Sequence, residues 1–379
     1  MGDLSDVMQP IEAARGLPNA HYVSDEMFLA ERDQLLFDTW AGLTVARRVP
    51  MAGDVLPLDF LGVPLLVVRG QDRQVRVFLN VCRHRGMVLV SEAKSLGPGA
   101  IRCPYHSWCY GQDGALKATP HVGGPGQNVA DGIHRNTLGL VPVRAHVWRD
   151  VVFVNMSGQA PAFEDYAGGL MARWSDFEGQ DLYDDGGVSA FTLDVACNWK
   201  LAVENYCESY HLPWVHPGLN SYSRLEDHYN IEAPGSYSGQ GTRVYRPSIG
   251  SDGQRFPDFA GLGATWDAGA EYVALYPNVL FGVHRDHAFA IVLEPVAKDR
   301  TREHVELYYA APEAVSHRMA DLRSANAALW HQVFEEDIFV VEGMQTGRQA
   351  PGFDGGRFSP AMDAATHCFH RWVAASMSG

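Results

Sequence analysis

Two short segments, each with one cysteine and one histidine, constrain this sequence most. The first holds Cys82 and His84 with one residue between them, and the second holds Cys103 and His106 with two. Thiolates and imidazoles bind either zinc or a [2Fe-2S] cluster, but structural zinc sites usually take paired cysteines from one segment and paired histidines from another. One of each per segment favours a [2Fe-2S] cluster, with both thiolates on one iron and both imidazoles on the other. A structural zinc site is the alternative.

The surrounding sequence is typical of an α+β protein. Between about residues 53 and 155, short β-branched stretches are broken by Gly, Pro and Asp, which predicts a small antiparallel β domain. Helical patterns and further apolar stretches follow, which predicts an antiparallel sheet covered by helices. The expected helices are 24–40, 162–177, 201–211 and 312–345, with strands inside 271–295.

The expected division of the chain has three parts. Residues 1–42 form a helical segment packed on the last domain, residues 43–156 hold the cluster, and residues 157–379 form the catalytic domain. Two domains are the usual arrangement for a chain of 379 residues.

Charge and hydropathy exclude several classes of function. A formal net charge of −15 disfavours nucleic acids and anionic membranes as partners. The sequence contains neither a membrane-spanning apolar run of about 18 residues nor the features of a secretory signal. A soluble, cytoplasmic protein is expected, whose six cysteines are thiols or metal ligands.

A second group of possible ligands lies between residues 205 and 216. Asn205, Glu208 and His211 are spaced by three, which would align them on one face of a helix. Pro213 is expected to break that helix, so that His216 approaches His211 from a loop. Two histidines and one carboxylate form a facial triad that binds ferrous iron and leaves positions open for oxygen.

The third ligand has three candidates in the last long helix, Glu335, Glu336 and Asp337. Asp337 has apolar helical neighbours, and a buried carboxylate is costly unless it is paired or bound to a metal. Asp337 is therefore the predicted ligand. The alternative is that His211 and His216 are ordinary core residues and that Asp337 pairs with an arginine.

The motifs resemble those of Rieske non-haem iron oxygenases over nearly the whole chain. The residues that carry the resemblance are Cys82-x-His84, Cys103-Pro104-Tyr105-His106-x-Trp108, and the segment that contains Glu336, Asp337, Glu342 and Gln345. The resemblance implies a Rieske [2Fe-2S] cluster, a helix-grip-like catalytic domain and mononuclear Fe(II) that uses O2. One departure is Ser107, where the family commonly has glycine.

The resemblance also implies partners. No Gly-x-Gly-x-x-Gly motif occurs, so NAD(P)H and flavin are expected on a separate reductase, with or without a ferredoxin. Glu208 would connect a cluster histidine of one subunit, His84 or His106, to His211 of the next, in a homotrimer. Asn205 is the second residue expected to act in catalysis.

Glu208, where many members have Asp, resembles oxygenases of the betaine, carnitine and choline kind. The implied reaction is hydroxylation or oxidative N-demethylation of a small quaternary ammonium compound. Five aromatic residues are candidates for cation–π contacts with it: Tyr206, Tyr210, Trp214, Tyr276 and Phe281. Because the same faces stack on an arene, an aromatic-ring hydroxylating oxygenase is the alternative.

Overall fold

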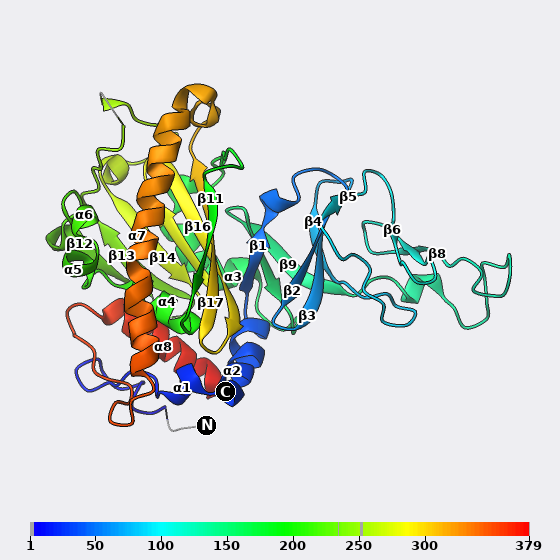
Figure 1. Cartoon of the computed structure of the whole chain (residues 1–379), viewed down its shortest axis with the longest axis horizontal. Coiled ribbons are helices and arrows are strands. Elements are labelled where there is room, and N and C mark those ends of the chain that lie inside the picture. The colour runs from blue at the N-terminus through cyan, green and yellow to red at the C-terminus, as the bar shows by residue number, and fades with distance from the viewer. Residues whose placement is uncertain (1–3, 234, 251–252, 379) are drawn as a thin grey trace. The chain divides into compact units, whose positions relative to one another are not determined.

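The computed structural model describes residues 4–233, 235–250 and 253–378. It divides into two compact units, one made of Met1–Gly42 with Ala160–Gly379 and the other of Leu43–Gln159 (Figure 1). In the described part of the chain, no helix has the length and apolar character that crossing a membrane requires.

The unit Leu43–Gln159 is built from β-strands, as its β-branched stretches predict. Its larger sheet has the order β1-β10-β9-β4-β3-β2-β5, and a small sheet has the order β6-β7-β8. The strands are β1 (Ala41–Val45), β2 (Asp54–Phe60), β3 (Val63–Arg69), β4 (Val75–Leu79), β5 (Lys94–Ser95), β6 (Ile101–Arg102), β7 (Cys109–Tyr110), β8 (Leu116–Ala118), β9 (Pro142–Trp148) and β10 (Val151–Asn155). The predicted antiparallel β domain is confirmed.

The other unit holds one antiparallel sheet with the order β11-β17-β16-β15-β14-β13-β12. Its strands are β11 (Ala190–Val195), β12 (His228–Glu232), β13 (Tyr237–Thr242), β14 (Ala270–Leu275), β15 (Val279–Val283), β16 (His287–Ala297) and β17 (Arg300–Tyr309). Its α-helices are α1 (Ala20–Val23), α2 (Asp25–Glu31), α3 (Phe163–Arg173), α4 (Trp199–Cys207), α5 (Leu212–Val215), α6 (Pro217–Asn220), α7 (Ala320–Gly347) and α8 (Ala364–Met377). The predicted combination of sheet and covering helices is confirmed.

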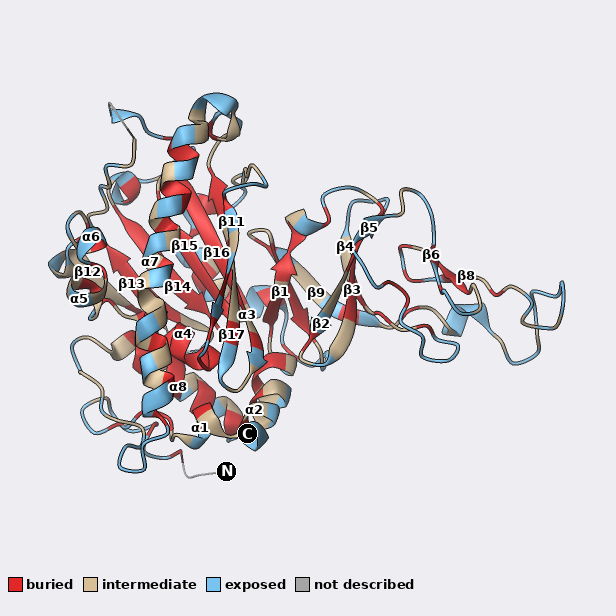
Figure 2. Ribbon diagram, viewed as in Figure 1, coloured by how far each residue is buried: buried red, intermediate tan, exposed pale blue. Residues whose placement is uncertain are grey.

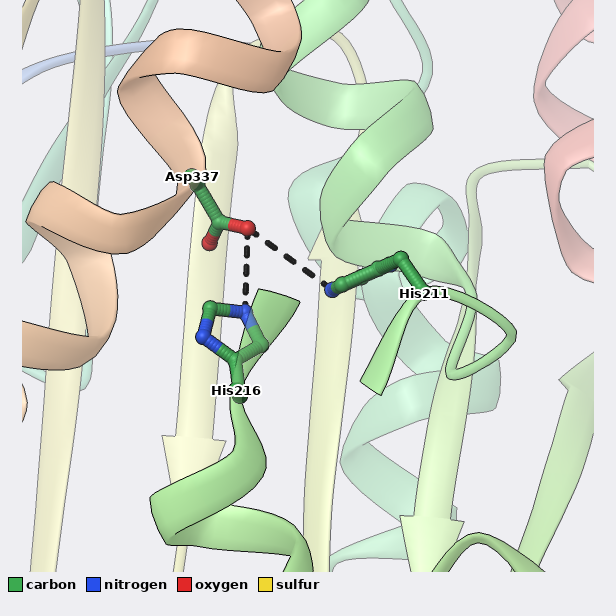
Figure 3. Close-up of side chains that lie close together, drawn as sticks. All are labelled: His211, His216 and Asp337. Carbon is green, nitrogen blue, oxygen red and sulfur yellow. Dashed lines mark ion pairs between the residues drawn. The ribbon is translucent and has the colours of Figure 1, made fainter. Parts of the chain in front are cut away.

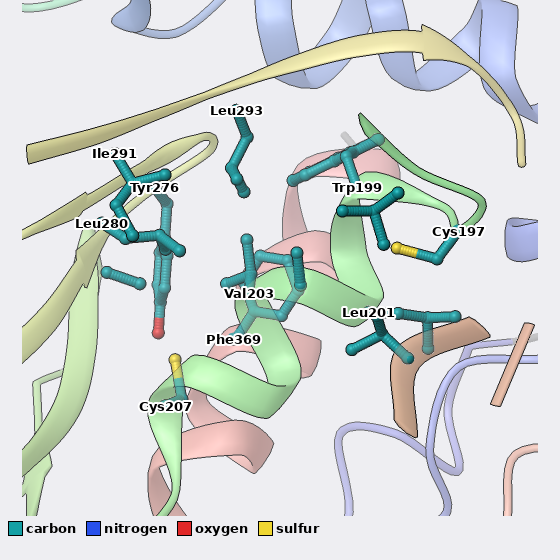
Figure 4. Close-up of a cluster of buried hydrophobic side chains, with 14 of the residues drawn as sticks. Cys197, Trp199, Leu201, Val203, Cys207, Tyr276, Leu280, Ile291, Leu293 and Phe369 are labelled. Carbon is teal, nitrogen blue, oxygen red and sulfur yellow. The ribbon is translucent and has the colours of Figure 1, made fainter. Parts of the chain in front are cut away.

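The centre of this sheet is buried on both faces. Every residue of β14 and β15 is buried, which requires cover on each side (Figure 2). Side chains alternate along the chain here, so Tyr272 of β14 and Tyr276, which directly follows that strand, lie on one face, in a large apolar cluster with α4 and α8 (Figure 4). Phe281 is in register with Val273 and packs edge-on against Trp174, on the opposite face.

The helix predictions were right in position and partly wrong in length. The expected helix 24–40 is α2, capped by Ser24, whose Oγ accepts the Met27 N–H at 3.3 Å, and continued by a π-helical turn at Arg32–Phe37. The long C-terminal helix begins only at Ala320, after two short 3-10 turns. Helix α8 was not predicted from the sequence. The expected helix 201–211 was too long at its end, because α4 ends at Cys207.

Candidate metal centres

Three side chains from separate elements meet beside the sheet. Asp337 comes from α7, His211 directly precedes α5, and His216 lies between α5 and α6. The Asp337 Oδ1 atom lies 3.0 Å from His216 Nε2 and 3.7 Å from His211 Nε2 (Figure 3). The two imidazole centroids are 5.1 Å apart and the rings are inclined by 71°. The structure thus brings together the three residues that the sequence nominated.

The end of α4 positions His211. Glu208 leaves the helix with extended backbone angles, φ −124° and ψ 157°. Its carboxylate accepts the backbone N–H groups of Tyr210 and His211 and, at 2.6 Å, the Nδ1–H of His211. Glu208 therefore satisfies N–H groups at a turn and orients the imidazole at the same time.

The expected role of Pro213 was wrong. The chain has already left the helix at Glu208, and Pro213 lies at the start of α5, where the fixed φ of proline suits the first helical turn. His211 and His216 are brought together because a short helix separates them, not because a long one is broken.

A second carboxylate, which the sequence analysis did not assign, orients His216. Glu336 Oε2 lies 2.8 Å from His216 Nδ1, and its other oxygen accepts the Gln332 side-chain amide at 2.9 Å. Burial by itself lowers the pKa of His216, but the carboxylates of Asp337 and Glu336 outweigh it and raise that pKa above its usual value. Both histidines therefore turn Nδ1 to a carboxylate and Nε2 to Asp337, the arrangement in which a metal-binding imidazole is held.

These residues fit a ferrous ion. Two imidazole nitrogens and one carboxylate oxygen lie within 4.8 Å of one another, a donor set that matches the 2-His-1-carboxylate triad. Asp337 Oδ1 is buried and makes no hydrogen bond of acceptable geometry with the residues that the structure describes. Buried acceptors without donors are rare, and a cation would satisfy this one.

An aromatic cavity adjoins the three side chains. Asn205, nominated for catalysis, and Tyr206, nominated for substrate contact, both line it. Four further aromatic residues line it that were not nominated: Tyr272, Phe289, Trp330 and Phe334. The signal for two of them was present in the sequence, because Trp330, Phe334 and Asp337 follow one another at helical steps of four and three.

Four nominated aromatic residues lie elsewhere. Trp214 is 71% exposed and Tyr210 is 44% exposed. Tyr276 packs against Phe369, and its hydroxyl donates to Ser238 Oγ at 2.5 Å. Phe281 lies on the opposite face of the sheet, so none of these four side chains lines the cavity, and their contact with a substrate stays a prediction.

Gly282 makes room for one aromatic side chain of the cavity wall. It lies in register between Tyr272 of β14 and Phe289 of β16. A Cβ atom at Gly282 would come within 2.3 Å of Cζ of Phe289, so the aromatic ring occupies the space that a side chain would fill. The glycine therefore leaves room for the Phe289 ring, which lines the cavity.

The four cluster candidates meet in the other unit. Cys82 and Cys103 are buried, whereas His84 is exposed and its ring centroid lies 4.7 Å from that of His106. The Tyr110 hydroxyl lies 3.2 Å from Cys82 Sγ. Burial raises the pKa of the Cys103 thiol, while the backbone N–H groups of Tyr105 and His106 favour its thiolate.

These residues fit a [2Fe-2S] cluster. Each loop supplies one buried sulfur donor and one imidazole, of which His84 is exposed and His106 half-buried. His106 Nδ1 is itself buried, without a hydrogen-bond partner among the described residues. The turns that carry them match as well. Gly86 has φ 76° and Ser107 has φ 58°, so Ser107 adopts the left-handed conformation for which glycine is the usual residue.

Comparison with known families defines the class of protein. The catalytic domain of the ring hydroxylating alpha subunit matches residues 182–379, and the Rieske [2Fe-2S] domain matches residues 39–131. The chain belongs to the ring hydroxylating alpha subunit family. It is a Rieske non-haem iron oxygenase with a [2Fe-2S] cluster and mononuclear iron, which confirms the resemblance seen in the sequence.

Individual relatives extend the comparison. The carnitine monooxygenase oxygenase subunit of Escherichia coli (strain K12) is 27% identical over 342 residues, 89% of this chain and 86% of that protein. The glycine betaine monooxygenase oxygenase subunit of Chromohalobacter salexigens is 30% identical over 235 residues, 62% of this chain and 50% of that protein. A solved quaternary ammonium Rieske monooxygenase, whose description includes carnitine oxidation and inter-subunit electron transfer, shares the fold with a TM-score of 0.76 at 21% identity, covering 99% of this chain and 98% of that one.

Proposed function

We propose that this oxygenase acts on a small quaternary ammonium compound of the carnitine or betaine kind, by hydroxylating a carbon bonded to nitrogen. The resulting hemiaminal would collapse to a demethylated amine and formaldehyde when the carbon is a methyl group. The names of the relatives support this class of substrate, since carnitine and glycine betaine both carry a trimethylammonium group.

The observation that carries the proposal is the aromatic wall of the cavity. The centroids of Phe289 and Trp330 lie 4.7 Å apart, those of Tyr272 and Trp330 lie 6.0 Å apart, and those of Phe289 and Phe334 lie 5.3 Å apart. Faces of tryptophan and tyrosine attract a desolvated cation by about 2 kcal/mol or more. A trimethylammonium group beside the triad would place its methyl carbons next to the metal.

The proposed ligands follow from the geometry above. His211, His216 and Asp337 would hold Fe(II), and the loops of Cys82 with His84 and of Cys103 with His106 would hold the cluster. When bound, the cluster supplies single electrons and the ferrous ion supplies open positions for oxygen. Glu208 and Glu336 accept the Nδ1–H groups of the two histidines and keep both Nε2 atoms free for the metal. Asn205 lines the same cavity as His211, His216 and Asp337.

We also propose the electron donor, the assembly, the compartment and the domain boundaries of the enzyme. A separate NAD(P)H-dependent flavoprotein reductase, directly or through a ferredoxin, would supply electrons to a cytoplasmic homotrimer. Glu208 would lie where His84 or His106 of a neighbouring subunit approaches His211. The proposed domains are residues 43–156 for the cluster and 157–379 for catalysis, with residues 1–42 packed on the latter. The inter-subunit electron transfer described for a structural relative supports this assembly.

A panel of substrates with a surrogate reductase tests the function. Carnitine, γ-butyrobetaine, glycine betaine and choline would be compared with naphthalene and benzoate, while NADH, oxygen, formaldehyde and hydroxylated products are measured. Formaldehyde or a hydroxylated ammonium compound formed in step with NADH consumption would support the proposal. Turnover restricted to arenes would replace it with ring hydroxylation.

A further inference from the structure

A second cavity, here called the outer cavity, adjoins the aromatic wall of the metal cavity. Its volume is about 400 Å³, and its lining includes Tyr245, His284 and His287. The lining also includes the exposed side chain of Arg246, so water reaches this space. Residues of the two cavities touch, because the His284 ring centroid lies 5.5 Å from that of Tyr272 and 5.1 Å from that of Trp330.

A hydrogen bond connects the two cavities. Tyr272 lines the metal cavity, and its hydroxyl lies 3.2 Å from His284 Nε2. His284 lines the outer cavity, is only 1% exposed, and its Nδ1 atom is buried without a partner. Burial, together with the neighbouring His287, holds the pKa of His284 well below its usual value, so the ring is neutral. A neutral imidazole accepts a proton at one nitrogen while it donates from the other.

A parallel chain of groups cannot carry protons. His287 Nε2 accepts the Trp330 indole N–H at 3.0 Å, and His287 Nδ1 donates to Asp286 at 2.6 Å. An indole only donates, so a proton cannot pass through Trp330. This chain fixes His287, which stacks on His284 with ring centroids 4.1 Å apart across the hairpin between β15 and β16.

Two other titratable groups of the metal cavity are also closed to proton transfer. The Tyr206 hydroxyl donates to the backbone carbonyl of Phe281 at 2.8 Å, where the chain of donors ends. His228 Nδ1 lies 2.7 Å from Gln240 Oε1, and its Nε2 lies 3.0 Å from Ser223 Oγ. Both nitrogens of His228 are thus held inside the fold. Tyr272 is the cavity-lining tyrosine whose hydroxyl partner lines a second, water-accessible space.

Oxygenation requires protons in the metal cavity. Hydroxylation consumes one O2, two electrons and two protons, and forms the alcohol and one water. Cis-dihydroxylation consumes the same electrons and protons, so the requirement does not depend on the substrate. The proton donors must reach a cavity whose walls include five aromatic side chains.

We propose that Tyr272 and His284 form a proton relay from the outer cavity to the metal cavity. A water molecule that moves from the outer cavity to the buried, unpartnered His284 Nδ1 gives it a proton, His284 Nε2 gives its proton to the Tyr272 oxygen, and Tyr272 gives its hydroxyl proton to the reacting oxygen. One proton enters and one leaves, with no change in net charge along the chain. The imidazole then returns to its starting tautomer before the next transfer.

Three variants test the relay. Tyr272→Phe keeps the aromatic face and removes the hydroxyl, His284→Gly removes the imidazole, and Tyr245→Phe is a matched control that removes a hydroxyl from the outer cavity. Tyr272→Phe and His284→Gly are expected to lose at least about tenfold in product formed per O2 consumed, with peroxide released instead. Their solvent deuterium isotope effect on single turnover should also change. The Tyr245→Phe enzyme should keep its product yield per O2 and its isotope effect.

Chemical rescue and a measurement without metals separate a relay from a structural role. Added imidazole should bind metal-free His284→Gly protein by calorimetry and restore product formation in the loaded enzyme. In metal-free protein labelled with 15N-histidine, Tyr272→Phe should move the His284 Nε2 resonance and leave His287 unchanged. Normal coupling in the Tyr272→Phe enzyme, or imidazole that binds without restoring turnover, would overturn the proposal.

Discussion

The two candidate metal centres are built in opposite ways. The cluster loops take their ligands from residues 82–84 and 103–106, each inside one tight turn. The mononuclear site joins α7 to the segment after α4, and its His216–Glu336 contact spans 120 residues. Local turn geometry therefore builds the first centre, and packing of distant elements builds the second. The contrast predicts that the first centre depends on its own loops and the second on carboxylates from two parts of the chain.

The largest expected effect is that of Asp337→Ala, which should remove one metal centre and leave the other intact. Asp337→Ala should lose the mononuclear iron and all measurable turnover, because it removes the carboxylate that lies beside both histidines, and the Rieske spectrum should remain. Iron content and visible absorption of the same sample measure the two sites. Glu335→Ala, at an exposed neighbour that faces His331, is the matched control and should keep both. Normal iron content in Asp337→Ala would reassign the third ligand.

The reciprocal change should leave the mononuclear site intact. His84→Cys and Cys103→Ser should abolish the Rieske absorption and the Rieske electron paramagnetic resonance signal, because each alters a ligand inside its loop. Turnover that depends on the reductase should stop, while about one iron per chain remains bound. Cys109→Ser is the control, since its thiol donates to the Ser107 carbonyl and is not a nominated ligand. A full Rieske signal in both variants would contradict the cluster assignment.

Intermediate effects are expected at the two supporting carboxylates. Glu336→Gln should weaken iron binding by about 10- to 100-fold, because the amide no longer supports the Nδ1–H of His216. Glu208→Gln should retain both metal centres and lower coupled turnover by about 10- to 100-fold. Iron titration measures the affinity of the Glu336→Gln variant for iron. Single turnover of a cluster-reduced enzyme measures the loss of activity in the Glu208→Gln variant. Equal losses of iron in both variants would show that Glu208 only supports His211.

The smallest expected effect lies in the loops of the cluster. Ser107→Gly should raise the free energy of unfolding by at most about 1 kcal/mol, since it relieves a left-handed conformation. Gly86→Ala, at the equivalent turn, should lower it by about 1 kcal/mol, although its Cβ would meet nothing within 4 Å. Thermal unfolding of the cluster-loaded protein measures both. Opposite signs would support the equivalence of the two turns.

Much of this protein could be predicted from the sequence. The paired Cys/His segments, the β-branched stretches and the spacing of His211, His216 and Asp337 indicated the two kinds of metal centre and the oxygenase class. These features are local or repeat with the period of one element, so they can be recognised without knowledge of the partners. The apolar neighbours of Asp337 in its helix were enough to single it out from two adjacent glutamates.

Tertiary structure decided the rest. The Glu208 carboxylate binds N–H groups beyond α4, which ends that helix four residues before the expected position. Strand register places Tyr272 in the metal cavity and Phe281 on the opposite face, although both belong to similar apolar stretches. The contact between Glu336 and His216 exists only because α7 packs beside the segment of α5 and α6. Periodicity tells which residues share a face, but the partner of that face is set by contacts between elements far apart in the chain.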